Sequence, residues 1–415
     1  MILDKPFPPD VRVEKEAKAL IDAGHKVHLL VFMRHRDKGE PEEEINGVKV
    51  HRVPHPRGKM SSLGNRWNSI KLQTTFVNPY WAKTIEQHAE KFKWAVLHAH
   101  DLQLVGSALS AGKKLGIPVV ADLHENKPDQ YLAKRASSPF FKRIKHAIRR
   151  NIFIWRLYER TALQQCDRVI VVVREMAERL YPYGIPESKI VIVSNTEDAS
   201  VFQINELDQE VLDRYRNDWV VSYIGGLAPY KGFSTLMRAL PLAAPDIPNL
   251  KCVIVGAKRQ EYVERYTKLA MQYGCDKWVD ILEWVPFKKV RSFMAASAAG
   301  ILPLDNFEQN QSVSSHKLFQ YMISGIPIIV SNMRSLKRLI EETGAGLVFE
   351  AGDPSSLARV LVDLYKNPGL RDRLGRNGYE AARGLYAWRN DAARLVSLYD
   401  ELNGEKTQDG TRNKY

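Results

Sequence analysis

The chain alternates short apolar runs with segments whose apolar residues recur every three or four positions. In residues 1–198 the apolar runs have the length of strands, and helical patterns separate most of them. Continuous apolar strands that alternate with helices are typical of parallel sheets covered on both faces. The strands predicted in this part of the chain are 26–32, 48–53, 94–98, 117–123, 168–173 and 189–194.

The alternation restarts after a polar stretch, residues 198–210, which lacks clear periodicity and which we interpret as a linker. Two such sets predict two Rossmann-like, doubly wound α/β domains, 1–198 and 199–384. The polar tail 404–415 is expected to be disordered. The strands predicted in the second domain are 219–226, 250–256, 278–282, 299–304, 326–331 and 346–349.

The first strand and helix are predicted near the start of the chain. A helix is expected to follow Asp10, because Val13 and Ala17 begin an apolar face and Gly24 ends the pattern. The strand before it is short, since "MILD" supplies about four residues against a usual five or six. Either this strand is abbreviated or the natural start of the chain lies upstream.

The composition favours a soluble, cytoplasmic protein. Apolar residues make up 44% and charged residues 26% of the 415 positions, which is ordinary for a globular chain. Three cysteines without C-x-x-C spacing argue against a disulfide framework or a zinc site and suit a reducing cytosol. The start has an acid and three prolines where a signal peptide needs an apolar run. No stretch approaches the roughly 18 consecutive apolar residues of a membrane span.

The net charge of +13 is concentrated in one segment. Residues 134–160 (Lys134 to Arg160) carry nine basic residues against the single acid Glu159, and their apolar residues share one helical face. A basic amphipathic helix suggests an anionic membrane surface, although a core-facing helix with a solvated back explains the pattern equally well. Nucleic acid is not expected as a partner, because no recognition motif or aromatic platform accompanies the charge.

Two helix N-termini in the second domain suit an anion. After the strand that ends near residue 224, Gly225 and Gly226 let a phosphate approach the backbone, and Lys231 precedes the next helix. This pattern is neither G-x-G-x-x-G nor a P-loop, so a dinucleotide fold and a P-loop NTPase are not supported.

The stretch "SSHKLFQYMISG" offers the second helix N-terminus. Each terminus presents unpaired N–H groups and about half a positive charge. Together with Lys231 and Lys317, the two termini are expected to hold a diphosphate without a metal. Helix capping by Ser314 or Ser315 is an alternative that does not exclude the anion.

Several pieces in register resemble one enzyme family across nearly the whole chain. They are "PFPPDVRVEKEAKALIDAGHKVHLL", "LHAHD", "VVADLHE", "IGGLAPYKG", "VIVG" and "KLFQYMISGIPIIVS". Together they are similar to family 4 of the retaining glycosyltransferases, which have the GT-B fold. The resemblance implies two domains that face a cleft, a nucleotide sugar bound mainly by the second domain, and a C-terminal helix (385–403) that packs back on the first.

The resemblance also implies roles for single residues. His124, just beyond a strand, matches a histidine at the reacting sugar, although a loop-capping role is the simpler alternative. Lys231 matches the lysine that neutralises the leaving diphosphate. On the acceptor side we expect Asp10, Arg12, His98 and Asp101, with His100 beside them. The residues expected at the donor are Gly225, Gly226, Lys231, Gly256, Ser314, Ser315, His316, Lys317 and Gln320.

Zinc is a further interpretation of the histidines, but H-x-H-D with a remote third histidine fits no common ligand spacing. We therefore expect no metal and no cofactor. The chain departs from the family pattern at three positions: Gly226 stands where an arginine is frequent, and Ser312 and Gln320 stand where two glutamates are common. A neutral Gln320 contributes less than a carboxylate, whose hydrogen bonds are worth about 1.5–3 kcal/mol. Lys317 is expected to share the phosphate contact that the missing arginine would make.

The sequence therefore predicts a metal-independent, retaining glycosyltransferase that moves a sugar from a nucleoside diphosphate to a glycan or lipid-linked acceptor. Two alternatives stay open. The departures at Gly226 and Ser312 also suit a non-catalytic GT-B subunit that binds a nucleotide sugar or a partner enzyme. A GT-B nucleotide-sugar epimerase is the third hypothesis, although no carboxylate pair supports it.

Overall fold

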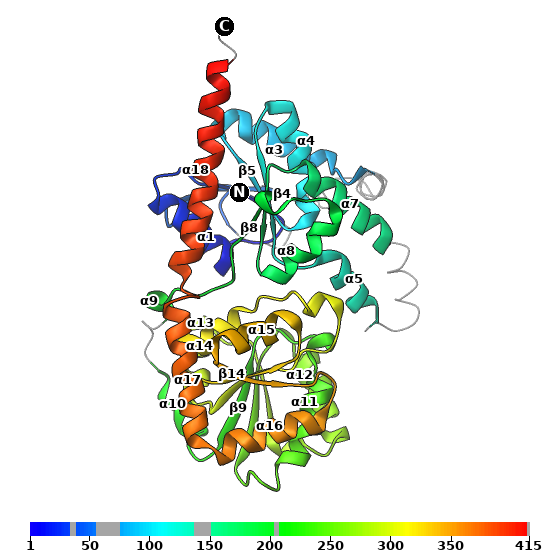
Figure 1. Cartoon of the computed structure of the whole chain (residues 1–415), viewed down its shortest axis with the longest axis vertical. Coiled ribbons are helices and arrows are strands. Elements are labelled where there is room, and N and C mark those ends of the chain that lie inside the picture. Colours follow the sequence, from blue (N-terminus) through cyan, green and yellow to red (C-terminus); the bar gives the residue numbers. More distant parts are fainter. Residues whose placement is uncertain (34–38, 55–74, 137–150, 203–206, 413–415) are drawn as a thin grey trace. The chain divides into compact units, whose positions relative to one another are not determined.

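The computed structural model describes residues 1–33, 39–54, 75–136, 151–202 and 207–412. These residues form two compact units, each built on a sheet whose strands are parallel except at one edge of the first (Figure 1). The prediction of two parallel-sheet α/β domains is confirmed. Unit 1 takes its residues from 1–132, 140–194 and 391–415, and unit 2 from 133–139 and 195–390.

The sheet of unit 1 has the strand order β3-β4-β2-β1-β5-β6-β7-β8. Its strands are β1 Ile2–Leu3, β2 His28–Met33, β3 Glu42–Ile45, β4 Val48–Pro54, β5 Leu97–His100, β6 Val119–Leu123, β7 Arg168–Val171 and β8 Ile190–Ile192. Its helices are α1 Val11–Asp22, α3 Pro79–Phe92, α4 Leu102–Leu115, α5 Lys127–Ala136, α7 Ile152–Gln165 and α8 Arg174–Leu180. The two-residue β1 is indeed abbreviated, yet it pairs with both β2 and β5.

One strand of unit 1 was missed by the apolar pattern. β3 reads "EEEI" and pairs antiparallel with β4 at the edge of the sheet. Its side chains are half-buried or exposed, so it lacks the apolar run of an interior strand. The signal that the pattern analysis passed over is the turn Asn46-Gly47, whose positive φ angles of 49° and 81° suit a tight hairpin.

The sheet of unit 2 has the order β11-β10-β9-β12-β13-β14, and all its pairings are parallel. Its strands are β9 Trp219–Ile224, β10 Leu250–Ala257, β11 Val279–Glu283, β12 Ala299–Leu302, β13 Ile328–Ser331 and β14 Gly346–Phe349. Its helices are α9 Ala199–Phe202, α10 Gln209–Arg214, α11 Phe233–Ala243, α12 Gln260–Gln272, α13 Phe287–Ala295, α14 His316–Ile323, α15 Arg334–Thr343, α16 Pro354–Lys366 and α17 Pro368–Arg383.

The stretch 198–210, interpreted as a linker, is partly helical. It contains α9 and the start of α10, and residues 203–206 lie outside the described part. Phe202 is buried in the core of unit 2 and explains why this polar stretch folds. A single buried aromatic residue is too weak a pattern to reveal a four-residue helix from sequence.

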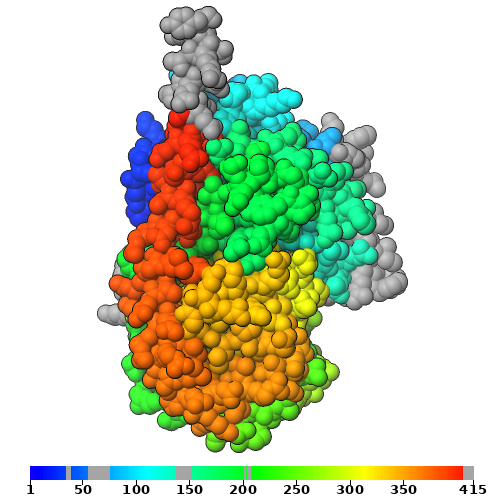
Figure 2. Space-filling model, in the orientation of Figure 1, coloured from blue at the N-terminus to red at the C-terminus, as the bar shows by residue number. Residues whose placement is uncertain are grey.

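The last helix, α18 (Trp388–Arg412), belongs to unit 1 from Asp391 onward. Leu395, Leu398 and Leu402 are buried at the three- and four-residue spacing of one helix face. Figure 2 shows this red helix at the surface beside the green segment that carries β7 and β8, where Arg394 donates to the carbonyl of Ile192. The structure describes α18 as continuing to Arg412, and the disorder of residues 404–415 stays a prediction.

The basic segment 134–160 lies only partly within the described residues. Residues 137–150 lie outside the described part, and with them most of the apolar face that the sequence predicted. The described portion of α7 exposes Phe153 and Leu157. No helix within the described residues is long and apolar enough to cross a membrane.

A cluster of histidines and aromatic rings fills the space between β2, β4 and α3. His28 Nδ1 lies 2.9 Å from His51 Nε2, and their rings stack at 5.1 Å. Phe92 packs 4.4 Å from His51. Burial and the neighbouring His51 lower the pKa of His28 to about 4, and burial lowers the pKa of His51 as well.

This cluster predicts acid destabilisation. An exposed histidine has a pKa of about 6.5, so between pH 6.5 and 4 the unfolded chain binds a proton at His28 that the folded chain does not. The melting temperature should therefore fall as the pH drops through this range. The variant His28→Gln should lose less of its melting temperature between pH 7.5 and pH 5 than the wild type. Equal losses in the two proteins would show that His28 does not cause the effect.

Candidate functional site

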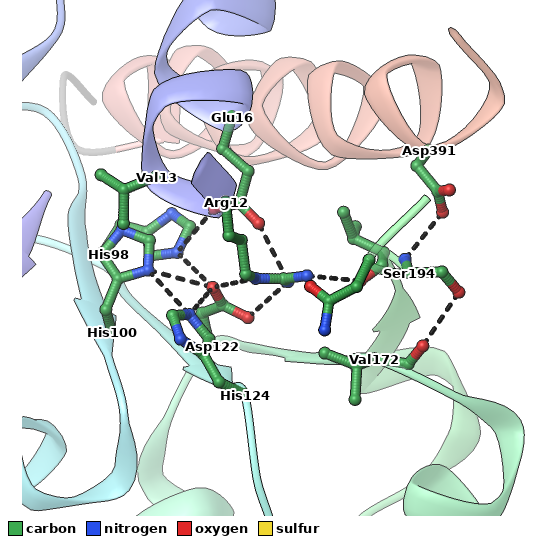
Figure 3. A network of polar contacts seen from close by, with 12 residues as sticks. Arg12, Val13, Glu16, His98, His100, Asp122, His124, Val172, Ser194 and Asp391 are labelled. Atoms are coloured by element: carbon green, nitrogen blue, oxygen red, sulfur yellow. Dashed lines mark hydrogen bonds and ion pairs between the residues drawn. The ribbon is translucent and has the colours of Figure 1, made fainter. Parts of the chain in front are cut away.

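Two neighbouring strands of unit 1 place polar side chains at their carboxyl ends. β5 ends with His98 and His100, which share a face because strand residues alternate. β6 carries Asp122, which is paired with His100 in the sheet, and His124 follows this strand. His100 Nδ1 and His124 Nε2 lie 3.0 and 2.7 Å from the same carboxylate oxygen, Asp122 Oδ2 (Figure 3). Ligands of parallel α/β sheets bind at this edge.

The guanidinium of Arg12, on α1, forms the centre of the network (Figure 3). Its Nε and Nη2 donate to the two oxygens of Asp122 at 3.1 and 2.8 Å. Nη2 also lies 2.9 Å from Glu16, one helical turn away, and Nη1 donates to the carbonyl of Val193 at 2.9 Å. The arrangement ties α1 to β6 and to the segment after β8.

Two residues that the sequence placed on the acceptor side are in the interior of unit 1. Arg12 is 4% exposed and His98 is 1% exposed, so neither lines an acceptor surface in this structure. Arg12 is drawn inward by two carboxylates, Glu16 and Asp122. His98 Nδ1 lies 2.8 Å from the hydroxyl of Tyr399 on α18. The helical position of Arg12 next to the chain start gave no sign of these partners.

The network sets the charge of each member. Burial opposes ionisation of Asp122, but the charge of Arg12 and the bonded histidines hold its pKa well below its usual range. Burial likewise opposes protonation of His124, yet the charge of Asp122 and its hydrogen bond raise the pKa of the His124 ring. Burial and His98 lower the pKa of His100 to about 3, so His100 is neutral. Burial raises the pKa of Glu16 to about 8 in spite of Arg12.

Asp101 and Asp10 lie at the same edge, each just before a helix. Asp10 caps α1 by accepting from the N–H of Val13 at 3.2 Å. Asp101 occupies the N-cap position of α4 but its side chain makes no capping bond, and its φ of 70° is strained for a non-glycine residue. Burial would raise the pKa of Asp101, but His124 and two lysines lower it. A strained aspartate that does not cap its helix is a candidate for contact with a ligand.

Four of the buried side chains are of types that bind metal ions and lie close together. One ligand atom from each of Glu16, His98, His100 and Asp122 lies within 4.8 Å of the others. However, Arg12 already forms ion pairs with the carboxylates of Glu16 and Asp122. The carboxylate of Asp122 also contacts His124. The guanidinium thus supplies the positive charge that a cation would bring. We assign no metal to this cluster, and the absence of a metal requirement stays a prediction.

The end of unit 1 is held by a second set of bonds at the start of α18. The backbone N–H of Ser194 donates to Asp391 at 2.8 Å, and the Ser194 hydroxyl donates to the carbonyl of Val172 at 2.9 Å (Figure 3). Asp391 is 1% exposed. These bonds fix the peptide that follows Val193, whose carbonyl is bound by Arg12.

In unit 2 the turn after β9 approaches another chain segment very closely. Gly225 has a φ of +147°, and a Cβ atom there would lie 1.7 Å from Cε of Lys317. A Cβ at Gly232 would lie 1.5 Å from the carbonyl oxygen of Pro303. Only glycine fits at both positions, and the Lys317 side chain therefore lies directly across the turn that the sequence identified.

Lys317 lies in the first turn of α14, and its charge faces that of Lys231. Burial and the charge of Lys231 lower the pKa of Lys317 to about 7. The Lys317 Nζ atom lies 5.6 Å from the centroid of the Tyr223 ring. No carboxylate among the described residues forms an ion pair with it. Lys317 in the first turn of α14 and Lys231 just before α11 are therefore candidates for contact with an anion.

A carboxylate that the sequence analysis missed lies on the other side of α14. Glu197, 4% exposed, accepts from Nε2 of Gln320 at 2.9 Å and lies 3.2 Å from Nδ1 of His316. It stands at the border of the stretch that was interpreted as a linker, so its sequence position gave no signal. Glu197 brings a negative charge next to Gln320, where the family pattern has a glutamate.

The two serines before α14 do not cap it with their side chains. Ser315 is the N-cap residue and makes no side-chain capping bond. The Ser314 hydroxyl instead accepts from the N–H of Asn195 at 3.3 Å, and the Ser314 carbonyl accepts from the Asn195 amide at 3.0 Å. In the described part of the chain, the Ser314 and Ser315 side chains therefore do not cap α14.

The remaining donor-side residues behave differently from one another. A Cβ at Gly226 would meet nothing within 4 Å, so the position of the absent arginine borders open space. Gly256 packs against Gly225, because its Cβ would lie 2.7 Å from the Gly225 carbonyl, and it supports the turn. Ser312 is 5% exposed, and its buried hydroxyl has no hydrogen-bond partner among the described residues. Its side chain is shorter than that of the glutamate in the family pattern.

Comparison with known proteins identifies both parts of the chain. The sequence profile of the Glycosyl transferase 4-like domain matches residues 9–196, and that of Glycosyl transferases group 1 matches residues 205–381. The chain is 24% identical over 265 residues to a D-inositol 3-phosphate glycosyltransferase of Corynebacterium efficiens, a match that spans 61% of either protein and thus less than two thirds of that relative. Over 423 residues it is 25% identical to the enzyme of that name from Streptosporangium roseum, covering 96% of this chain and 90% of the relative.

Solved structures agree with these matches at the level of the fold. Sucrose-phosphate synthase from Thermosynechococcus elongatus superposes with a TM-score of 0.75 at 16% identity, covering 97% of this chain and 95% of that one. Anabaena HepE in complex with UDP-glucose gives a TM-score of 0.69 at 16% identity, covering 96% and 98%. The chain therefore belongs to the group 1 glycosyltransferases, with a Glycosyl transferase 4-like first domain and the GT-B fold.

Proposed function

We propose that this protein is a retaining, metal-independent glycosyltransferase that moves a sugar from a nucleoside diphosphate to the hydroxyl group of a glycan or lipid-linked acceptor. The observation that carries this proposal is that Lys317, in the first turn of α14, faces the charge of Lys231, which lies just before α11. Anions are stabilised at a helix N-terminus, and two ammonium groups without a metal match the charge of a diphosphate. Anabaena HepE, of the same fold, has been solved with UDP-glucose.

The reaction we propose is a front-face displacement. The bond between the anomeric carbon and the diphosphate oxygen breaks, and its electron pair leaves with the diphosphate. The acceptor oxygen forms its bond to the same face of that carbon, and its proton passes to the departing diphosphate. Lys231 and Lys317 stabilise the negative charge that develops on the leaving group, which favours the transition state.

Gln320 and Glu197 support binding of the nucleoside. The Nε2 group of Gln320 is bonded to Glu197, so Oε1 remains as the amide atom that accepts from a ribose hydroxyl. A hydrogen bond to this neutral amide is weaker than one to a carboxylate. Glu197 lies in contact with both His316 and Gln320 and holds their side chains in place for the donor.

His124 is the residue we propose to act at the reacting sugar. It stands at the carboxyl end of β6, and its Nε2 is bound to Asp122, which leaves Nδ1 as the ring nitrogen for a sugar hydroxyl. Asp101 and Asp10, at the same edge of the sheet, are our candidates for acceptor hydroxyl groups. The basic segment 134–160 is our candidate for contact with an anionic membrane surface that carries a lipid-linked acceptor.

Ser312 favours one alternative function. Its short, buried side chain replaces a glutamate of the family pattern, and a chain that has lost this contact suits a non-catalytic subunit that still binds nucleotide sugar. An epimerase, the other alternative, would isomerise the donor without an acceptor.

A donor screen distinguishes these functions. The protein is incubated with UDP-, GDP- and ADP-sugars, with and without simple glycan or polyprenyl phosphate-linked acceptors, and release of the nucleoside diphosphate is measured. We expect acceptor-dependent release with at least one donor, an unchanged rate in EDTA, and a product that keeps the anomeric configuration of the donor. Binding without release would support the subunit, and acceptor-free isomerisation would support the epimerase.

Diphosphate binding should depend on both lysines and on pH. Lys231→Ala should raise the dissociation constant of free UDP or GDP by about 10- to 100-fold, since a charged contact is worth about 1.5–3 kcal/mol. The pKa of Lys317 is about 7 without ligand and a bound anion raises it, so affinity should fall as the pH rises from 7 to 9. Lys317→Arg stays charged and should lose this pH dependence. Calorimetry checks both effects, with Lys337→Ala as an exposed control; unchanged affinity in Lys231→Ala would refute the assignment of the site.

Removal of His124 should affect turnover more than donor binding. Positive charge grows on the sugar only as the bond to phosphate breaks, so a contact made there is strongest in the transition state. His124→Ala should lower kcat by about 100-fold or more and leave the dissociation constant of the nucleoside diphosphate within about twofold. His25→Ala, a histidine after α1, serves as the matched control. Normal turnover per folded molecule in His124→Ala would exclude this residue from the mechanism.

A further inference from the structure

The side chain of Asp122 is bound on both sides, by a cation and by imidazoles. Arg12 forms a bidentate ion pair with the two carboxylate oxygens of Asp122. Asp122 Oδ2 also lies 2.7 Å from His124 Nε2 (Figure 3). Asp122 is completely buried, whereas the His124 side chain keeps 12% of its exposure. The order along this line is Arg12, Asp122, His124, from the interior towards the edge of the sheet where ligands bind.

We propose that Asp122 is a positioning residue for the sugar transfer, a role that rests on the function proposed above: it holds the ring of His124 with Nε2–H pointing inward and Nδ1 presented to the substrate. Arg12 keeps Asp122 ionised and fixes the plane of its carboxylate. Nothing in the sequence pattern assigned a role to Asp122, and the comparisons assign none.

The geometry determines which nitrogen of His124 can act. Asp122 is ionised and can only accept, so the nitrogen that faces it carries a proton. The nearest other group, His100 Nδ1, lies 3.2 Å from the same His124 nitrogen and donates to the same carboxylate oxygen. Within the described residues Nδ1 of His124 has no hydrogen-bond partner, which leaves it for a substrate hydroxyl.

Asp122 also affects the electrostatics of His124. The surroundings of His124 favour its protonated form, and an isolated imidazolium would repel the positive charge that develops on the sugar. Because Asp122 and Asp101 are both ionised, they balance the charges of Arg12 and of a protonated His124, and the Nδ1–H group can donate to a sugar hydroxyl without adding net positive charge to the cluster. Without Asp122 the ring would be neutral near pH 7 and free to rotate.

Other titratable groups around His124 do not replace Asp122. Asp101 acts on it through charge alone, since no hydrogen bond joins the two. His98 and His100 are kept neutral by burial. The charged and titratable groups that face the ring from the neighbouring elements are Asp10, Arg12 and Glu16 from α1 and the turn before it, His98 and His100 from β5, Asp101 before α4, and Asp122 from β6.

The test measures the state of the ring directly. Long-range ¹H–¹⁵N spectra of the full-length protein give the pKa of His124 and the nitrogen that holds the proton, with His124→Gln used to assign the signal. We expect titration above 6.5 and a proton on Nε2 in the neutral form. In Asp122→Asn the pKa should fall below 6.5. In Glu16→Gln, the matched carboxyl-to-amide change in the same cluster, it should move much less, because Glu16 is already largely neutral at pH 7.

Kinetics supply the second readout. Asp122→Asn should lower kcat about 10- to 100-fold, a loss typical when the partner that orients a functional histidine is removed, with little change in KM for the donor. Turnover should decline with rising pH as His124 deprotonates, and this decline should move to lower pH in the variant. A purely structural role of Asp122 would reduce the amount of folded protein without moving the pH profile.

The possible outcomes separate this inference from the proposed function. An unchanged His124 pKa in folded Asp122→Asn would overturn the inference even if the enzyme is active. If that variant does not fold, the wild-type spectra decide, since a proton on Nδ1 or a pKa below 6.5 would overturn it. A pKa that falls as expected in a protein without turnover for any donor would refute the proposed function and leave the control of His124 by Asp122 intact.

Discussion

The organisation of unit 1 depends on the buried ion pair between Arg12 and Asp122. It joins α1 to β6, and the same guanidinium holds Glu16 and the carbonyl of Val193. Removing one partner of such a pair costs about 3–5 kcal/mol, because the other charge stays buried without compensation. That is a large part of the roughly 5–15 kcal/mol that stabilises a domain. The pair therefore anchors the sheet edge on which His124 is presented, and its cost is tolerated where function needs an ionised carboxylate inside the protein.

Unit 2 relies on close backbone approach rather than on a buried pair. Gly225 lets the Lys317 side chain cross the turn after β9, and Gly232 lets the following turn touch Pro303. The first contact brings the turn against the first turn of α14, and the second brings the residue before α11 against the loop after β12. A side chain at Gly225 would collide with Lys317, and one at Gly232 would collide with the backbone of Pro303, so glycine at both positions keeps these segments close together.

The sequence was informative wherever a pattern repeats locally. The alternation of apolar runs predicted the strands of both sheets except β3, and strand-end position directed attention to His124 and the turn at Gly225. It failed where a role depends on a distant partner. Arg12 and His98 look like exposed polar residues until Glu16, Asp122 and Tyr399 surround them. Glu197 reaches His316 and Gln320 across more than a hundred residues of sequence. One signal was available and not used: Asp122 is a lone acid within the apolar strand "VVADL", and a charge in such a strand requires a partner.

The balance of charge separates the structural role of one cluster from the ligand-binding role of the other. In the cluster of unit 1 the charge of Arg12 is met by Asp122, and the charges of Asp122 and Asp101 raise the pKa of His124. Such a cluster gains nothing from an additional ion, and it is better suited to hold one side chain in one orientation. In unit 2, burial and the charge of Lys231 lower the pKa of Lys317 to about 7, so Lys317 is only partly protonated near neutral pH. The charge of Lys231 thus disfavours the protonated form of Lys317 in the unliganded protein, and in the function we propose a bound diphosphate relieves this repulsion. For the function we propose, the cluster of unit 1 orients His124 at the sugar, and Lys231 and Lys317 of unit 2 offer positive charge to the leaving group.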